Sequence, residues 1–116
     1  MRYLLLICGV ESDLGVESVT ADPDKAAMDA AKWVEEMNGR GVRKFGSALR
    51  STSTATTVRV RDGETLTTDG PFAETREQIL GFDLIDCGDL DQAIQVAAKH
   101  PAARVGAVEV RPLWTD

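Results

Sequence analysis

Histidine and cysteine are scarce in this 116-residue chain, which contains one histidine, His100, and two cysteines, Cys8 and Cys87. Because this set cannot form a zinc cluster of familiar spacing, we expect no metal and no cofactor. Two cysteines far apart, with no pairing pattern, are typical of reduced thiols in a cytoplasmic protein. The single histidine precedes Pro101, and we interpret it as a cation at a helix C-terminus. That interpretation leaves no base for a serine hydrolase triad.

Long hydrophobic runs and an excess of basic charge are also missing. The apolar run at residues 3–10 is too short to span a membrane, and its single preceding basic residue does not make a signal peptide. Acidic residues outnumber basic ones by 19 to 13, giving a formal net charge of −6. No basic stripe is available to neutralise phosphates. We therefore expect neither membrane insertion nor nucleic-acid binding.

Aromatic residues are few as well, with two Trp, one Tyr and three Phe. The core must therefore consist mainly of aliphatic side chains, and the length fits a single domain over residues 1–116. Apolar patterning predicts strands at residues 3–8, 42–49, 57–61, 64–68, 79–85 and 105–111. Asp62-Gly63 is typical of a type I′ turn and predicts a hairpin, while residues 9–21 are predicted to form a loop.

Two helices are predicted from their caps and apolar stripes. Asp22 as N-cap and Pro23 at the first helical position begin a helix that ends at Gly39. Asp89 and Gln92 have the spacing of a capping box and begin a second helix, which Pro101 ends.

The element order is β-α-β, a hairpin and then β-α-β, which is the split βαβ or ferredoxin-like pattern. We predict an α+β fold with both helices on one face of an antiparallel sheet. The other face would expose a large apolar patch, and pairing two sheets face to face removes it. We therefore predict a homodimer that forms an α+β barrel, with a ligand cleft between the sheets and Trp114 at the interface.

One segment, residues 69–82, reads DGPFAETREQILGF and resembles the YCII-related family of DGPF type, whose members carry a DGPFAETKE segment. YLLLI at residues 3–7, TATTVRVRDGE at 54–64 and VEVRPL at 108–113 extend the resemblance over nearly the whole chain. The resemblance implies a ferredoxin-like dimeric α+β barrel but no particular reaction. It also implies a link to extracytoplasmic-function sigma factors, which accompany some members.

Two positions depart from the family pattern. Arg76 stands where the family has Lys, and an arginine can bind a carboxylate through two parallel bonds but cannot act as a proton-accepting amine. The smaller YciI-type relatives use a His–Asp pair near the first strand and helix, whereas residues 9–37 of this chain contain no histidine. That mechanism therefore cannot be transferred to this sequence.

The candidate site comprises Asp69, Phe72, Glu74, Arg76 and Arg111. In the catalytic hypothesis Glu74, partly desolvated in a cleft, is a general base and Asp69 is the second carboxylate of an acid/base pair. Arg76 and Arg111 would bind an anionic substrate, and Phe72 would provide an apolar contact.

The same residues admit a structural interpretation. Asp69 would form an Asx-turn, Phe72 would belong to the core, and Arg76 would pair with Glu74 or Glu77 in a solvated ion pair. Arg111 would pair with Glu74 or Asp69 inside the cleft.

Two functions follow from these alternatives. The favoured function is binding or transforming a small metabolite, with an anionic one preferred, and whether the protein is an enzyme stays open. The alternative is a non-catalytic interaction or regulatory module linked to a sigma factor.

Overall fold

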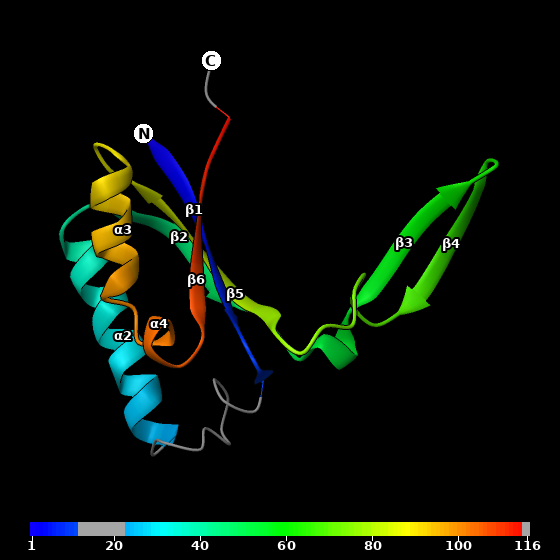
Figure 1. The fold of residues 1–116 in the computed structure, drawn as a ribbon, viewed down its shortest axis with the longest axis horizontal. Coiled ribbons are helices and arrows are strands. Elements are labelled where there is room, and N and C mark those ends of the chain that lie inside the picture. The colour runs from blue at the N-terminus through cyan, green and yellow to red at the C-terminus, as the bar shows by residue number, and fades with distance from the viewer. Residues whose placement is uncertain (12–22, 115–116) are drawn as a thin grey trace.

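The computed structural model describes residues 1–11 and 23–114, and its strands and helices follow the predicted order. The elements are β1 (Arg2–Gly9), α2 (Pro23–Gly39), β2 (Arg43–Ala48), the 3-10 helix η1 (Thr52–Thr54), β3 (Thr56–Arg61), β4 (Glu64–Asp69), β5 (Gln78–Asp86), α3 (Leu90–Ala98), α4 (Ala102–Val105) and β6 (Ala107–Pro112). Figure 1 labels them in space. The predicted N-cap Asp22 and most of the predicted loop at residues 9–21 lie outside the described residues.

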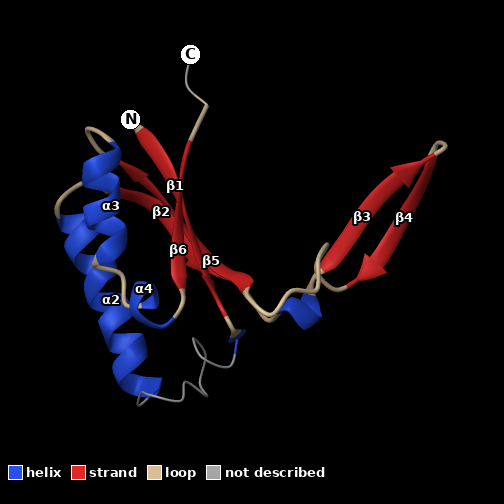
Figure 2. Cartoon of the chain, viewed as in Figure 1, coloured by secondary structure: helices blue, strands red, loops and turns tan. Residues whose placement is uncertain are grey.

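The body of the molecule is a four-stranded sheet with strand order β2-β5-β1-β6, in which every neighbouring pair is antiparallel. Helices α2 and α3 lie on one face of this sheet, as Figure 2 shows. The architecture is therefore α+β, and its order is compatible with the predicted ferredoxin-like pattern. Strand β1 is central in the sheet, between β5 and β6.

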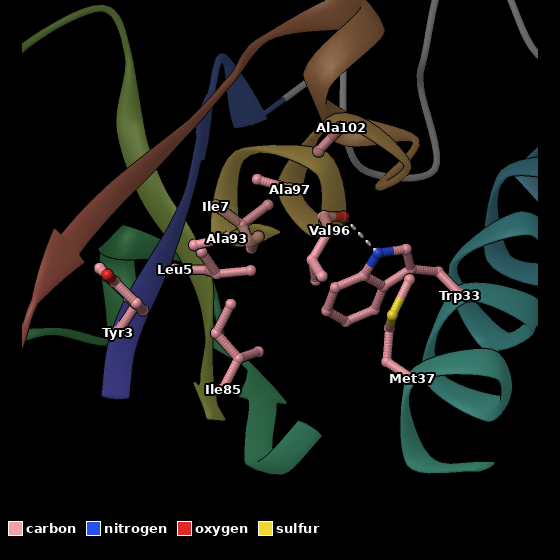
Figure 3. Close-up of a cluster of buried hydrophobic side chains, with 10 residues drawn as sticks. All are labelled: Tyr3, Leu5, Ile7, Trp33, Met37, Ile85, Ala93, Val96, Ala97 and Ala102. Atoms are coloured by element: carbon pink, nitrogen blue, oxygen red, sulfur yellow. Dashed lines mark hydrogen bonds between the residues drawn. The ribbon is translucent and has the colours of Figure 1, made fainter. Parts of the chain in front are cut away.

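Alternation along β1 divides the apolar side chains between the two faces of the sheet. Tyr3, Leu5 and Ile7 are buried under the helices, whereas Leu4 and Leu6 point the other way and are partly exposed. Figure 3 shows the core that forms under the helices. Its members are Tyr3, Leu5, Ile7, Trp33, Met37, Ile85, Ala93, Val96, Ala97 and Ala102. A fully buried leucine such as Leu5 contributes roughly 1.5–3 kcal/mol to stability.

The start of α3 confirms the predicted cap. The Asp89 carboxylate accepts a hydrogen bond from the backbone N–H of Gln92 at 2.9 Å. The Gln92 side chain in turn accepts from the backbone N–H of Gly88 at 2.8 Å, so two N–H groups at this end are satisfied. Beyond α3 the prediction is less accurate, because Pro101 begins the short helix α4 and the last strand starts only at Ala107.

His100 is not the exposed cation that its place near a helix end suggested. The residue is buried, its Nδ1 accepts a hydrogen bond from the backbone N–H of Ala102 at 3.0 Å, and its ring meets Trp33 edge-on at 4.8 Å. Burial lowers the pKa of His100 to about 4, so the imidazole is neutral near pH 7. The core contact with Trp33 takes the place of the expected interaction with the helix dipole.

Strands β3 and β4 form a separate two-stranded sheet, here called the arm (residues 56–69). Its turn has positive φ at Asp62 (52°) and Gly63 (79°), as the predicted type I′ turn requires. The arm projects away from the body on the side of the sheet opposite the helices (Figure 1). The radius of gyration is 15.8 Å, against about 13 Å for a compact domain of this length.

Candidate functional site

A groove of about 710 Å³ lies where the arm joins the body. Three chain segments meet there, because β1 and β5 run antiparallel and the link from β2 into the arm begins at the same end of the sheet. The groove is lined by Val10, Glu11, Ser51, Thr52, Ser53, Gly70, Pro71, Glu74, Thr75, Arg76 and Gln78. The lining therefore consists mainly of polar side chains from residues that lie far apart in sequence.

One wall of the groove is the η1 segment. The Glu11 carboxylate accepts hydrogen bonds from the backbone N–H of Thr52 at 2.7 Å and from the Thr52 hydroxyl at 3.2 Å. Ser51 caps η1 by accepting from the backbone N–H of Ser53, and the two serine hydroxyls lie 3.0 Å apart. Glu11 is therefore committed to holding this wall, while hydroxyl groups are gathered on it. The sequence interpretation missed Glu11, which it placed in the loop at residues 9–21.

The opposite wall is the segment between β4 and β5. Gly70 begins it with a φ of 102°, a left-handed conformation that glycine adopts without strain. Its N–H donates to Ala55 O at 2.7 Å, and its carbonyl accepts from the Thr57 hydroxyl at 2.8 Å, so this wall is tied to the first strand of the arm. Further along, the Gln78 amide donates to Ala73 O at 3.1 Å and to Thr75 O at 2.9 Å.

Of the five candidate residues, the structure brings Glu74 and Arg76 together in the lining of the groove. Both side chains are exposed, so the single chain does not supply the desolvation that the general-base hypothesis requires. Asp69 is exposed at the end of β4, opposite Thr56, and does not line the groove.

Phe72 and Arg111 lie elsewhere. Phe72 is 79% exposed, so its interpretation as a core residue of this chain is wrong. Arg111 forms an ion pair with Glu109, not with Glu74 or Asp69. In the antiparallel ladder, Arg111 on β6 lies opposite Leu4, near the start of β1. The groove is at Val10, six residues further along the chain, which is roughly 20 Å in an extended strand.

A buried ion pair that the sequence interpretation missed lies on the helix-covered face of the sheet. Arg43 Nε is 2.8 Å from Asp83 Oδ1, and both side chains are largely buried. Burial raises the pKa of Asp83, although the Arg43 guanidinium opposes the shift. A Cβ on Gly46, the residue opposite Asp83, would lie 2.0 Å from Asp83 Oδ1. The pair therefore requires glycine at position 46, and a lone aspartate within an apolar strand was its signal in the sequence.

Two further expectations concern metals and membranes. Within residues 1–11 and 23–114, no group of three or more His, Cys, Asp or Glu side chains is placed to hold a metal ion. Over the same part of the chain, no helix combines the length and the apolar character needed to cross a bilayer.

Comparison with known proteins defines the family. The model of the YCII-related domain matches residues 1–115, and the chain belongs to the YCII-related family. A protein of Rhizobium meliloti (strain 1021), described as uncharacterized, is 53% identical over 74 residues. That region covers 60% of this chain and 60% of the Rhizobium protein, so the match spans less than two thirds of the relative's length. The resemblance stated from the sequence is confirmed at the level of the YCII-related family.

Proposed function

We propose that the protein binds a small organic acid in the groove at the base of the arm. The observation that carries the proposal is that Arg76, Ser51 and Ser53 all line one groove. A guanidinium and hydroxyl donors together suit a carboxylate or another anionic group. A groove of this size also falls within the range typical of small-molecule sites.

The two carboxylates of the groove narrow the ligand class. Glu11 already accepts two hydrogen bonds from Thr52, whereas Glu74 is exposed at the rim. A ligand that also carries a hydroxyl or ammonium group could donate to Glu74 while its acidic group contacts Arg76. The favoured ligands are therefore hydroxy- and amino-carboxylic acids. In a catalytic form of the proposal, Glu74 is the base and Asp69 is the second carboxylate, reaching the ligand only after the arm moves.

The Arg76→Ala variant tests this proposal in a thermal-shift screen of hydroxy- and amino-carboxylic acids. At 100 times Kd a specific ligand stabilises the native protein by about 2.7 kcal/mol, which corresponds to a shift in Tm of several degrees. We expect that shift to disappear in Arg76→Ala and to persist in Arg104→Ala, which removes an exposed arginine from α4. Equal shifts in all three proteins would contradict the proposed site.

We further propose that a second copy of the chain covers the uncovered face of the sheet and forms the dimeric α+β barrel. The apolar side chains of this open face include Leu4, Leu6, Phe45, Phe82 and Leu84, and the Phe45 and Phe82 rings contact each other with centroids 5.8 Å apart. An apolar patch that one chain leaves uncovered suits a self-complementary interface. Arg111 and Glu109 lie at its β6 edge, where Arg111 could reach a ligand held between two copies.

The remaining proposals concern location and partners. The free thiols Cys8 and Cys87 support a reducing, cytoplasmic location. Association with a sigma factor stays a prediction from the family resemblance. It becomes the favoured function if no small molecule stabilises the protein and the Arg76→Ala variant is indistinguishable from the native chain.

A further inference from the structure

The arm exposes apolar side chains that its own chain does not cover. Val58 and Val60 are 60% and 58% exposed. Among the described residues, the extensive contacts of β3 are with β4 alone. An isolated two-stranded hairpin is at best marginally stable in water, so an arm of this kind needs a further surface to pack against.

The two faces of the arm differ in chemistry. Cross-strand register places Val58 opposite Thr67 and Val60 opposite Thr65, so the two pairs nearer the turn on this face are β-branched and uncharged, while Thr56 and Asp69 lie on the same face at the base of the arm. We call the two pairs nearer the turn the valine face. The other face carries Arg59 opposite Leu66 and Arg61 opposite Glu64, a pattern suited to solvent. The valine face is therefore the side of the arm built for burial.

The position of the arm favours a second copy of this chain as its partner. In Figures 1 and 2 the helices cover one side of the sheet, while the arm stands on the other side, the side of the open face. A copy that packs on the open face therefore comes to lie beside the arm, and two-fold symmetry gives each copy the same two contacts.

The area of the open face supports the same partner. Strands spaced about 4.8 Å apart, with about 3.3 Å per residue, give a four-stranded face of six-residue strands a footprint of roughly 400 Å². A stable interface buries about 800 Å² on each partner. The arm adds roughly 200 Å² by the same spacing, and the surface that the partner's arm covers adds as much again. The accessible area of such a face exceeds its flat footprint because side chains project from it, so sheet and arm together reach the usual size of a stable interface.

We infer that the arm is a dimer clasp: the valine face of each copy packs against the other copy and extends the interface formed by the two open sheet faces. The inference rests on the second copy proposed above and not on the ligand. It assigns a function to the hairpin, which contributes no residue to the hydrophobic core of the body.

The test compares two arm variants with the native protein by analytical ultracentrifugation without ligand. Val58→Glu/Val60→Glu places two carboxylates on the valine face, and Arg59→Gln/Arg61→Gln makes the same change in net charge on the other face. Because an unpaired buried charge is costly, we expect the valine variant to dimerise about 100-fold more weakly and the arginine variant to match the native protein. Circular dichroism checks that the body remains folded in both.

A third variant separates this inference from the proposed dimer. Leu6→Glu introduces a charge on the open face and leaves the arm unchanged. If Leu6→Glu dissociates the dimer while Val58→Glu/Val60→Glu does not, the clasp is overturned, and the proposed dimer through the open sheet faces is supported. A native protein that is monomeric at all concentrations overturns both. Equal weakening by the valine and arginine variants also overturns the clasp, because it would show an effect of charge alone.

Discussion

The body and the arm differ in how their apolar side chains are covered. The body covers one face of its sheet with helices, and within the described residues every buried side-chain nitrogen or oxygen has a hydrogen-bond partner. The arm has only its own ladder and turn to hold it, and its valines face outward. The helix-covered side of the body therefore has a core within one chain, whereas the arm, like the open face of the sheet, is built to be completed by another surface. The groove lies where these two regions join.

The largest expected effect on stability acts on the body and not on the arm, and it is at Gly46. In Gly46→Ala the new Cβ meets Asp83 Oδ1 at 2.0 Å and the carbonyl of Phe82 at 2.7 Å, so the buried ion pair with Arg43 must shift. We expect a loss of about 3 to 4 kcal/mol in the free energy of unfolding, measured by urea denaturation.

Two controls sharpen that comparison. Gly39→Ala adds a Cβ that meets nothing within 4 Å. Val60→Ala removes exposed methyl groups from the arm. Each should change the unfolding free energy of the single chain by about 0.5 kcal/mol or less. A loss in Gly46→Ala no larger than in these controls would show that the body tolerates a shifted ion pair.

A second, slightly smaller effect is expected from pH, and it acts on the body alone. The pKa of His100 falls from 6.5 to about 4 on folding, so the folded state prefers the neutral ring. Stability from this group is complete above pH 6.5 and is lost as pH falls towards 4, because only the unfolded chain takes up the proton. The full loss, reached below pH 4, amounts to about 3 kcal/mol, and about 2.5 kcal/mol of it falls between pH 7 and pH 4.5.

Comparison of unfolding curves at pH 7 and pH 4.5 for native protein and His100→Asn measures this loss. The acidic groups whose pKa values folding lowers, Glu36 and Asp86, also destabilise the protein on acidification, but they are present in both chains. The difference between the two curves therefore belongs to His100. An unchanged pH dependence in His100→Asn would mean that the ring titrates in the folded body.

The smallest predicted effect is a coupling between ligand binding in the groove and docking of the arm. The segment between β4 and β5 and the η1 segment both line the groove and both connect the arm to the sheet. A ligand in the groove and a docked arm should therefore favour each other, with a coupling of about 1 kcal/mol or roughly fivefold in affinity. Titration of the dimer by dilution, with and without an acid found in the screen, measures it. Identical dimer affinities would show that groove and arm act independently.

Sequence patterns predicted the strands and helices of the body and the turn of the arm well, because these features are specified locally. The apolar run of β1, the Asp62-Gly63 turn and the Asp89 cap each follow from neighbouring residues. The register between strands does not, and register is what separates Arg111 from Glu74. The exposed Phe72 and the Arg43–Asp83 pair depend in the same way on which segments meet in space.

The candidate site was predicted only in part for a related reason. Glu74 and Arg76 were found because a short charged segment contains both. Glu11 and the hydroxyls of η1 reach the groove from distant parts of the chain, and no periodic pattern marks them.

The two tryptophans occupy opposite environments, and this gives the protein two optical reporters. Trp33 is 3% exposed and donates its indole N–H to the carbonyl of Val96 at 3.0 Å, whereas Trp114 is 94% exposed beyond the end of β6. An indole in an apolar core emits at shorter wavelengths than one in water, so the native spectrum is a sum of two bands. Replacing Trp114 leaves a single emitter that reports on packing beneath the sheet. Replacing Trp33 leaves one that reports on whatever approaches the C-terminal segment from outside.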